Sequence, residues 1–246
     1  MSIRPAAAPR SRKRARQVNQ WHRTAGISAV VVLLYLLATG LPLQFSAELD
    51  LGQRHVGSDW VLDWYGLQAP DEAKRSGPAV ALGGTLFVNG YEHVGISRLV
   101  GAVPAGAVLA VAAPNEVWLF HPGVPDPERT ALGPTIARIG SLRGQIYLDT
   151  TQGLLAGDAL LMNWTPTNAP NDTIEWASAT TLGAGEAAPY RQRFRGRMLT
   201  VERWLQDLHS GRFFGTPGVV VVDVASLLML ILAGTGIVLW WRQRRG

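Results

Sequence analysis

Five histidines are the residues of this 246-residue chain best suited to bind a metal ion or a haem iron. Two of them, His22 and His209, stand beside long apolar segments. The other three, His55, His93 and His121, are far apart and lack a metal-binding spacing such as His-x-x-x-His, so we predict ordinary structural roles for them. The chain has no cysteine, which excludes disulfides, cysteine-ligated zinc, iron–sulfur clusters and the attachment motif of c-type haem. A bound iron would therefore take its ligands from His, carboxylate, Met or Tyr side chains.

A single charge, Asp223, interrupts the apolar run from Gly218 to Trp241. Because an ionised acid is costly inside a membrane, such a residue is a candidate functional group that needs a partner. Arg212, Tyr35 and His209 are the candidates for that partner. The alternative is a purely structural ion pair that stabilises the start of the helix, and the sequence does not decide between the two.

The chain carries no recognised catalytic motif. It lacks a Gly-x-Ser-x-Gly elbow, a phosphate-binding P-loop and a dinucleotide fingerprint followed by an acid at the right distance. No nucleophile, base and acid stand in a spacing that indicates a catalytic set. Neither a hydrolase nor a nucleotide-dependent enzyme is therefore predicted.

Two apolar segments are long enough to cross a membrane. Residues 25–43 hold no charge, and the run from Gly218 to Trp241 would cover about 36 Å as a helix, against a hydrocarbon core of about 30 Å. We therefore predict transmembrane helices at residues 21–45 and 216–241. A cleaved signal peptide is the alternative for the first, but its apolar region usually holds only about 7 to 15 residues and ends in a small-x-small site. Phe45 stands where a small residue would be needed, so we predict that the first helix is retained.

The net charge of +5 lies in the flanks of these two segments. Residues 1–24 carry seven Arg and Lys and no acid, residues 242–246 carry three Arg, and residues 44–217 carry 13 basic against 17 acidic residues. This distribution indicates membrane orientation and contact with anionic lipid, and it argues against nucleic-acid binding. We predict a bacterial inner-membrane protein with cytoplasmic N- and C-termini and a periplasmic central domain. Residues 1–20 are predicted as a disordered basic tail and residues 242–246 as a short cytoplasmic tail.

The central region, residues 46–198, is predicted as a β-rich domain. Short apolar runs alternate with turn signals such as Asn89-Gly90 and Arg143-Gly144, which predicts roughly six or seven strands in an antiparallel meander. Residues 165–197 are rich in Pro, Thr, Ala and Gly and are predicted as a loop or linker. They lead to an amphipathic surface helix at residues 199–211, for which Thr200 can form the N-cap. The predicted fold class is a membrane α+β protein, with two transmembrane helices flanking a β-rich extracytoplasmic domain.

Three stretches lie at the ends of the apolar segments: WHRTAGI with TGLPL, ERWLQDLHSGRFFGTPG, and TGIVLWWRQRR. Together they resemble the PepSY-associated transmembrane helix family (PepSY-TM) over about 70 residues, 21–43 and 199–245. Larger members of that family have more spans and often periplasmic PepSY domains. They include siderophore-iron reductase membrane proteins, which carry haem b on helix histidines. This chain has two predicted spans, and GQIYLDTTQGLL is its one stretch that is loosely similar to a PepSY domain.

The resemblance implies haem b as cofactor, His22 and His209 as its ligands, and an accessory role in transmembrane electron transfer or periplasmic iron reduction. The two histidines are predicted at opposite membrane surfaces, about 30 Å apart, so one chain cannot hold a haem between them. A bis-histidine site would need a homodimer or a larger membrane partner. The alternative function is a non-catalytic, membrane-anchored protein that binds or regulates a periplasmic partner. Haem content separates these two functions, and the sequence leaves open whether the chain is an enzyme.

Overall fold

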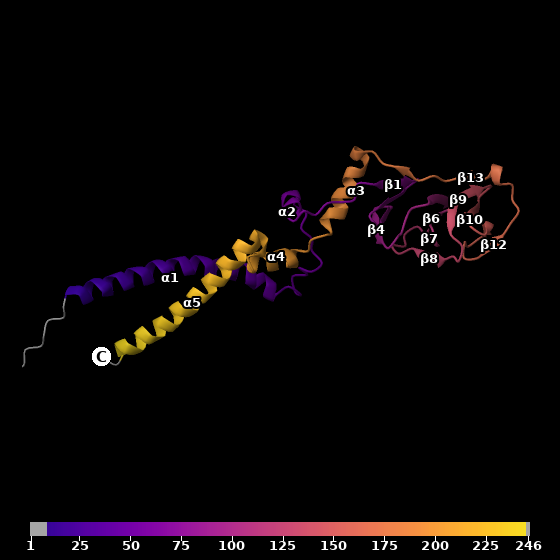
Figure 1. The fold of residues 1–246 in the computed structure, drawn as a ribbon. Coiled ribbons are helices and arrows are strands. Elements are labelled where there is room, and N and C mark those ends of the chain that lie inside the picture. The colour runs from indigo at the N-terminus through magenta and orange to yellow at the C-terminus, as the bar shows by residue number, and fades with distance from the viewer. Residues whose placement is uncertain (1–8, 245–246) are drawn as a thin grey trace, which may run out of the picture. The chain divides into compact units, whose positions relative to one another are not determined.

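The computed structural model describes residues 9–244, which divide into two compact units (Figure 1). The first combines the two ends of the chain, Met1–Gly57 and Arg197–Gly246, and is called the membrane unit below. The second, Ser58–Gly196, is called the β-rich unit. The β-rich unit is therefore an insertion in the chain of the membrane unit.

The membrane unit consists of two long helices and a short helical connection. Helix α1 (Pro9–Gln44) contacts both α4 (Val201–His209) and α5 (Gly215–Arg244), and the 3₁₀ turn η2 (Arg212–Phe214) joins α4 to α5. The segments Gln20–Gln44 and Arg212–Val238 are long and apolar enough to cross a membrane. They agree closely with the two predicted spans. Thr200 caps α4 as predicted, since its side chain accepts a hydrogen bond from the Arg203 amide.

The helices extend further toward the chain ends than predicted. Residues 9–20, predicted as disordered, form the first turns of α1, and residues 242–244 end α5. Arg, Lys, Gln and Ala are good helix formers, so a helix that the apolar segment nucleates continues into the basic flank. The rest of the two predicted tails, residues 1–8 and 245–246, lies outside the described residues.

The chain that leaves α1 is tied to the start of α4 by main-chain hydrogen bonds. The Val56 amide donates to the Leu199 carbonyl at 2.9 Å, and the Val201 amide donates to the Arg54 carbonyl at 2.8 Å. A third bond, from the Glu202 amide to the Leu51 carbonyl, is 3.1 Å long. These bonds hold the segment that follows α1 beside the segment that begins α4, and both segments belong to the membrane unit.

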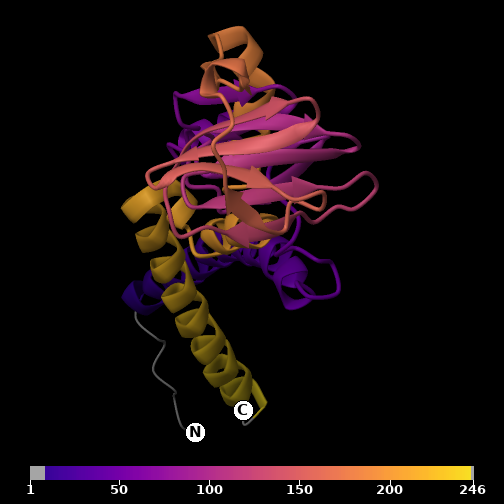
Figure 2. The same ribbon diagram turned by 90° about the vertical axis from the view of Figure 1, so that its right-hand side faces the viewer.

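Fourteen strands form three antiparallel sheets in the described part of the β-rich unit, about twice the number predicted (Figure 2). The first sheet has the order β14-β1-β2-β3-β4, with β1 (Ala73–Ser76), β2 (Ala79–Leu82), β3 (Thr85–Val88), β4 (Tyr91–Val94) and β14 (Thr180–Thr181). The second has the order β5-β6-β7-β8, with β5 (Gly101–Ala105), β6 (Val108–Ala113), β7 (Glu116–Phe120) and β8 (Glu128–Ala131). The third has the order β12-β11-β10-β9-β13, with β9 (Ile136–Leu142), β10 (Gln145–Thr150), β11 (Gly153–Gly157), β12 (Trp164–Pro166) and β13 (Glu175–Trp176).

The strands β6 and β7 at the centre of the second sheet are buried on both faces. On one face Val111 and Trp118 pack with Leu86 of the first sheet. On the other face Ala110 packs with Ile139 of the third sheet. Alternate residues of a strand point to opposite faces, so β6 must be apolar at every position. The predicted antiparallel meander is confirmed, since consecutive strands pair in each sheet, and the strands are divided among three sheets.

Two helices of the β-rich unit were not predicted. Helix α2 (Asp59–Trp64) buries Val61 and Leu62, and α3 (Ala184–Gly196) lies in the segment predicted as a linker, which also contains β13, β14 and the 3₁₀ turn η1 (Asn171–Thr173). Three apolar side chains of α3, Ala187, Tyr190 and Phe194, pack on the first sheet. Their spacing is helical, but Gly185 and Pro189 weaken the local helix signal, so tertiary packing determines the helix.

Candidate functional site

His209, the last residue of α4, is held by a hydrogen bond to α1. Its Nδ1 lies 2.9 Å from the Oγ1 of Thr39, a buried residue in the last turns of α1. The same Oγ1 lies 3.0 Å from the Tyr35 carbonyl and 3.2 Å from the Leu36 carbonyl. A threonine hydroxyl has one proton, which it donates to these main-chain acceptors, so it accepts from Nδ1–H of His209. Nε2, the other ring nitrogen, has no hydrogen-bond partner among the described residues, and in the neutral ring with this tautomer it carries the lone pair.

Gly40 gives the imidazole ring room to lie against α1. A Cβ added at this position would lie 3.0 Å from Cε1 and 3.4 Å from Nδ1 of His209. Since real Cβ atoms rarely come so close to other atoms, any side chain here would press on the ring. Thr39 therefore orients the His209 ring, and the absence of a side chain at Gly40 leaves space for the ring.

The end of α4 is fixed by two further features. The hydroxyl of Tyr35 donates to the Leu208 carbonyl, one of the last carbonyls of the helix, which have no partner within it. Beyond it, Gly211 has a left-handed φ of 77° and lies against Gly218 in α5. A Cβ on Gly218 would be only 2.2 Å from the Gly211 carbonyl oxygen. These contacts leave His209 little freedom to move away from Thr39.

An apolar cleft of about 520 Å³ lies between α1 and the start of α5. Its volume is within the range of about 300–1,000 Å³ that is usual for small-molecule sites. Tyr35 and Gly211, both described above, contribute to its wall. The complete lining is Val31, Val32, Tyr35, Gly211, Phe214, Pro217, Gly218, Val221 and Val222. The cleft begins one helical turn from Thr39 and two residues from His209, so an apolar ligand could be bound close to the free Nε2.

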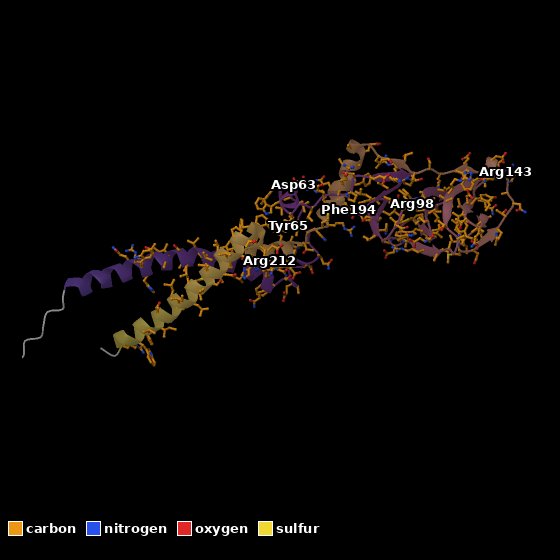
Figure 3. All side chains as sticks on the ribbon, in the orientation of Figure 1. Asp63, Tyr65, Arg98, Arg143, Phe194 and Arg212 are labelled. Atoms are coloured by element: carbon orange, nitrogen blue, oxygen red, sulfur yellow. The ribbon has the colours of Figure 1, made fainter. Side chains whose placement is uncertain are left out.

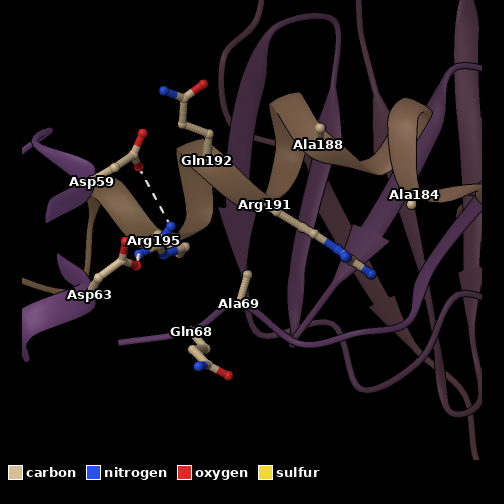
Figure 4. Close-up of a pocket in the computed structure, with 9 residues that line it drawn as sticks. All are labelled: Asp59, Asp63, Gln68, Ala69, Ala184, Ala188, Arg191, Gln192 and Arg195. Atoms are coloured by element: carbon tan, nitrogen blue, oxygen red, sulfur yellow. Dashed lines mark hydrogen bonds and ion pairs between the residues drawn. The ribbon is translucent and has the colours of Figure 1, made fainter. Parts of the chain in front are cut away.

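A second, polar cleft of about 650 Å³ lies between α2 and α3 within the β-rich unit (Figure 4). At one end Arg195 forms ion pairs with Asp63 and with Asp59, the latter at 3.5 Å, and its Nε donates to the Leu67 carbonyl at 2.9 Å. Arg191 also lines the cleft. The lining therefore carries two basic and two acidic side chains, and its formal net charge is zero. The rest of the lining is two glutamine amides and three alanines, so charged and amide groups face the cleft together with small apolar ones.

The chain matches the family model described as the PepSY-associated TM region over residues 3–243. It belongs to this family. No curated protein and no solved structure matches the chain. The family match includes the β-rich unit, well beyond the roughly 70 residues that carried the resemblance in the sequence, and it identifies the chain as a membrane protein whose two apolar helices contact lipid.

The second predicted ligand of this PepSY-associated protein, His22, is remote from the first. His22 lies on α1, 17 residues before Thr39, which corresponds to about 26 Å along the helix. Since His209 contacts Thr39, one chain does not bring the two histidines to one iron. Across the described residues there is also no group of three or more His, Asp or Glu that could hold a metal ion.

Asp223 has none of its predicted partners. Tyr35 bonds to Leu208 and His209 bonds to Thr39, so neither contacts Asp223, and no ion pair joins it to Arg212 within the described chain. Both Asp223 and Arg212 are exposed, and Figure 3 labels Arg212 near the junction of α4 and α5. At about 100° per residue, Asp223 lies roughly opposite Gly218 and Val221, the residues of α5 that line the apolar cleft beside α1.

Sequence reasoning did not connect Thr39 and Gly40 with His209, and it missed the ion pairs of Arg195 with Asp59 and Asp63. A Thr-Gly pair inside an apolar run was the one signal for the first two, because it offers a hydroxyl beside a position without a side chain. For Arg195 no local signal existed, since Asp59 and Asp63 are more than 130 residues away in the sequence.

We expect the β-rich unit of this PepSY-associated protein to lose stability as the pH falls through about 6.5. His93 is buried beside Phe120, with ring centroids 5.0 Å apart, and burial lowers its pKa. Asp126 raises this pKa and Arg129 lowers it, with the net effect downward. The unfolded chain then takes up a proton near the ordinary pKa of about 6.5, while the folded chain does not, so folding is favoured above that pH and disfavoured below it.

The measurement is urea unfolding at pH 7.5 and pH 5.5 for the wild type and His93→Gln. The wild type should lose up to about 1.4 kcal/mol per pH unit more than the variant, which is the limit for one proton. Equal pH dependence in the two proteins would show that His93 titrates in the folded state as it does in the unfolded state.

Proposed function

We propose that this PepSY-associated membrane protein binds haem b through His209 and serves transmembrane electron transfer or periplasmic iron reduction in the bacterial inner membrane. The observation that supports this function is the hydrogen bond between His209 and Thr39. It engages Nδ1 and leaves Nε2 as the ring nitrogen that could ligate haem iron.

The residues around His209 fit this role. A hydrogen bond to the second ring nitrogen orients a ligating histidine and increases its basicity, and Thr39 supplies that bond. Gly40 lets the ring lie against α1, and the apolar cleft beginning at Tyr35 offers a surface that excludes water. Haem b, when bound, would supply one-electron ferric and ferrous chemistry, while the chain positions the ring and controls solvent access.

One chain supplies one such ligand. Because His22 is about 26 Å away along α1, it could not bind the same haem as His209, and a second histidine ligand would have to come from another molecule. His22 would belong to a separate site near the start of the first span, Gln20–Gln44. This arrangement favours an accessory role, in which the protein contributes a redox group to a larger membrane assembly.

An absorption spectrum of the detergent-purified protein, oxidised and then reduced with dithionite, tests this function. Expression with ample haem should give a Soret band that shifts on reduction and sharp bands typical of low-spin haem b. A wild-type preparation without a Soret band under these conditions would refute the proposal for both histidines.

We expect both chain ends to be cytoplasmic, because their basic residues flank the two spans. Reporters fused after Arg245 or before Trp21 should show activity in the cytoplasm. A reporter inserted at Gly106, in the turn between β5 and β6 where a side chain would meet no atom within 4 Å, should show activity in the periplasm. A periplasmic C-terminus would contradict this orientation.

The alternative function is a non-catalytic protein whose β-rich unit binds a periplasmic partner. The polar cleft between α2 and α3 supports it, since the cleft offers paired charges and two glutamine amides that could bind a polar segment of a partner. A haem-free protein whose partner binding requires Arg191 or Gln192 would support this function over the first.

A further inference from the structure

Two exposed tryptophans lie on one side of the short helix α2. Trp60 and Trp64 are 63% and 61% exposed, and their i, i+4 spacing places both rings on the same side of the helix. The other tryptophans of the β-rich unit differ from them, since Trp118 is fully buried and Trp164 and Trp176 are half-buried. We call the surface formed by Trp60 and Trp64 the tryptophan face.

The rotation of α2 about its own axis is fixed by contacts on its other sides. At about 100° per residue, Val61 and Leu62 point away from the tryptophan face, and they are only 2% and 1% exposed. Asp59 and Asp63 point to a further side, where both form ion pairs with Arg195 of α3 (Figure 4). The tryptophan face is the side that remains, so the folded unit holds it outward.

The end of α2 is also fixed. The Gly66 amide donates to the Asp63 carbonyl and the Leu67 amide donates to the Leu62 carbonyl, both at 2.9 Å, and Gly66 has a left-handed φ of 66°. The Leu67 carbonyl in turn accepts from Nε of Arg195 at 2.9 Å. Because the backbone of α2 is already ordered, little conformational entropy is lost when the tryptophan face binds a partner.

The tryptophan face is close in the chain to the membrane unit. The chain leaves that unit after Gly57, and Trp60 follows three residues later, which is at most about 11 Å of extended chain. It returns to the membrane unit after Gly196, the residue next to Arg195. The chain therefore enters the β-rich unit beside α2 and leaves it beside the arginine that holds α2.

Exposed tryptophans of the membrane unit mark one membrane surface. Trp21 is 75% exposed at the start of the first span, and Trp240 and Trp241 are 51% and 58% exposed just after the second. Because the β-rich unit is inserted between the two spans, these residues lie at the membrane surface on the other side from it. Trp204, the remaining tryptophan of the membrane unit, is half-buried. Membrane proteins are enriched in tryptophan at both surfaces, so the surface on the side of the β-rich unit lacks exposed tryptophan from the membrane unit.

We infer that α2 binds the lipid–water interface through its tryptophan face. Trp60 and Trp64 supply the aromatic residues of the membrane surface on the side of the β-rich unit. An indole ring suits this position because its apolar body enters the boundary of the acyl chains while its N–H stays with water and headgroups. The short chain between Gly57 and Trp60 keeps this surface within reach of α2 in every molecule, which selects lipid as the partner.

This contact depends on amphipathic rings and not on charge. Asp59 and Asp63 lie on a different side of α2, and Arg195 offsets part of their charge. The contact therefore needs no anionic lipid. It gives the β-rich unit an attachment to the membrane besides the chain itself, and it requires neither haem nor a protein partner.

Nitroxide labels on single cysteines test the contact, because the chain has no native cysteine. The full chain is reconstituted in phosphatidylcholine vesicles with a label at Trp60→Cys or Trp64→Cys. Tyr91→Cys and Leu160→Cys are matched controls, since these residues of the same unit are 55% and 76% exposed. Labels on α2 should collide more with oxygen, which concentrates in lipid, than with a water-soluble nickel chelate. The control labels should show the reverse.

Substitution of Trp64 in the Trp60→Cys background then tests the ring itself. Trp64→Tyr keeps an amphipathic ring and should leave the lipid exposure of the label unchanged. Trp64→Ala removes the ring and should lower the ratio of oxygen to nickel collisions toward the control value. High salt should change neither result, since it screens charges and leaves apolar contacts intact. The midpoint of thermal unfolding checks that each variant is folded.

Four results would overturn the inference. They are α2 labels as exposed to water as the controls, control labels as exposed to lipid as those on α2, a lipid signal that high salt abolishes, and an α2 label shielded from water only in native membranes. The last would show that another membrane protein covers the tryptophan face. Since none of these measurements involves haem, they are independent of the test of the proposed function.

Discussion

A His209→Ala variant should lose the haem absorption of the purified protein and still insert into the membrane. Alanine removes the Nε2 that would bind the iron, while the energy of insertion comes from the apolar spans, which stay intact. The measurement is the Soret absorbance per mole of protein after expression with ample haem, together with the amount of protein in the carbonate-washed membrane. We expect a loss of more than about tenfold in the first and no change in the second.

Thr39 provides the matched control for this experiment. Thr39→Ser keeps the hydroxyl that accepts from Nδ1–H and should retain haem, whereas Thr39→Ala leaves the ring without its orienting bond and should weaken haem binding by about 10- to 100-fold. His22→Ala should leave the His209 signal unchanged, because the two residues lie far apart on α1. A full Soret band in His209→Ala would place the haem on another residue.

A Gly218→Ala variant should destabilise the turn between α4 and α5 severely. The new Cβ would lie 2.2 Å from the Gly211 carbonyl oxygen and 2.7 Å from Cβ of Phe214, both parts of the packed turn that cannot move independently. Overpacking of this kind costs about 1–3 kcal/mol or more, and the helix junction must open to relieve it. We expect a lower midpoint of thermal unfolding for the purified protein, or faster proteolysis between α4 and α5.

Gly236→Ala is the control for Gly218→Ala. It lies in the same helix, and its new Cβ would meet no atom within 4 Å. It should be neutral or slightly stabilising, since alanine favours the helix. Equal behaviour of the two variants would mean that α4 and α5 do not meet at Gly211 and Gly218.

Local sequence signals determined which parts of the fold were predictable. The two spans are recognisable because lipid requires long apolar helices, and α4 is recognisable from its helical period and the Thr200 cap. The layered sheets were not, because β6 is apolar on both faces and loses the alternation that marks a half-buried strand. Helix α3 was missed because packing of Phe194 and its neighbours, not helix propensity, holds it in place.

In the candidate site, too, features with a local sequence signal were predicted and features that depend on tertiary packing were not. His209 could be chosen from residue type and position, because histidine is the strong iron ligand left in a chain without cysteine. Its bond to Thr39 joins residues 170 positions apart, so no window of sequence contains it. Tyr35 and His209, two of the partners expected for Asp223, bond to other residues, because the side of α5 that faces α1 depends on packing that sequence spacing does not reveal.

The insertion of the β-rich unit between α1 and α4 has a consequence for the order of events during synthesis. Thr39 leaves the ribosome 170 residues before His209, a delay of roughly 10–30 s at about 5–20 residues per second. Throughout this time α1 must persist in the bilayer without the helix that will pack against it. During this time the Thr39 hydroxyl donates to the Tyr35 and Leu36 carbonyls of the same helix. Helix α1 therefore exposes no unsatisfied hydroxyl donor to the lipid at this position. When α4 arrives, the oxygen of that hydroxyl still has a lone pair to offer to His209, and the contact can form without breaking any earlier bond.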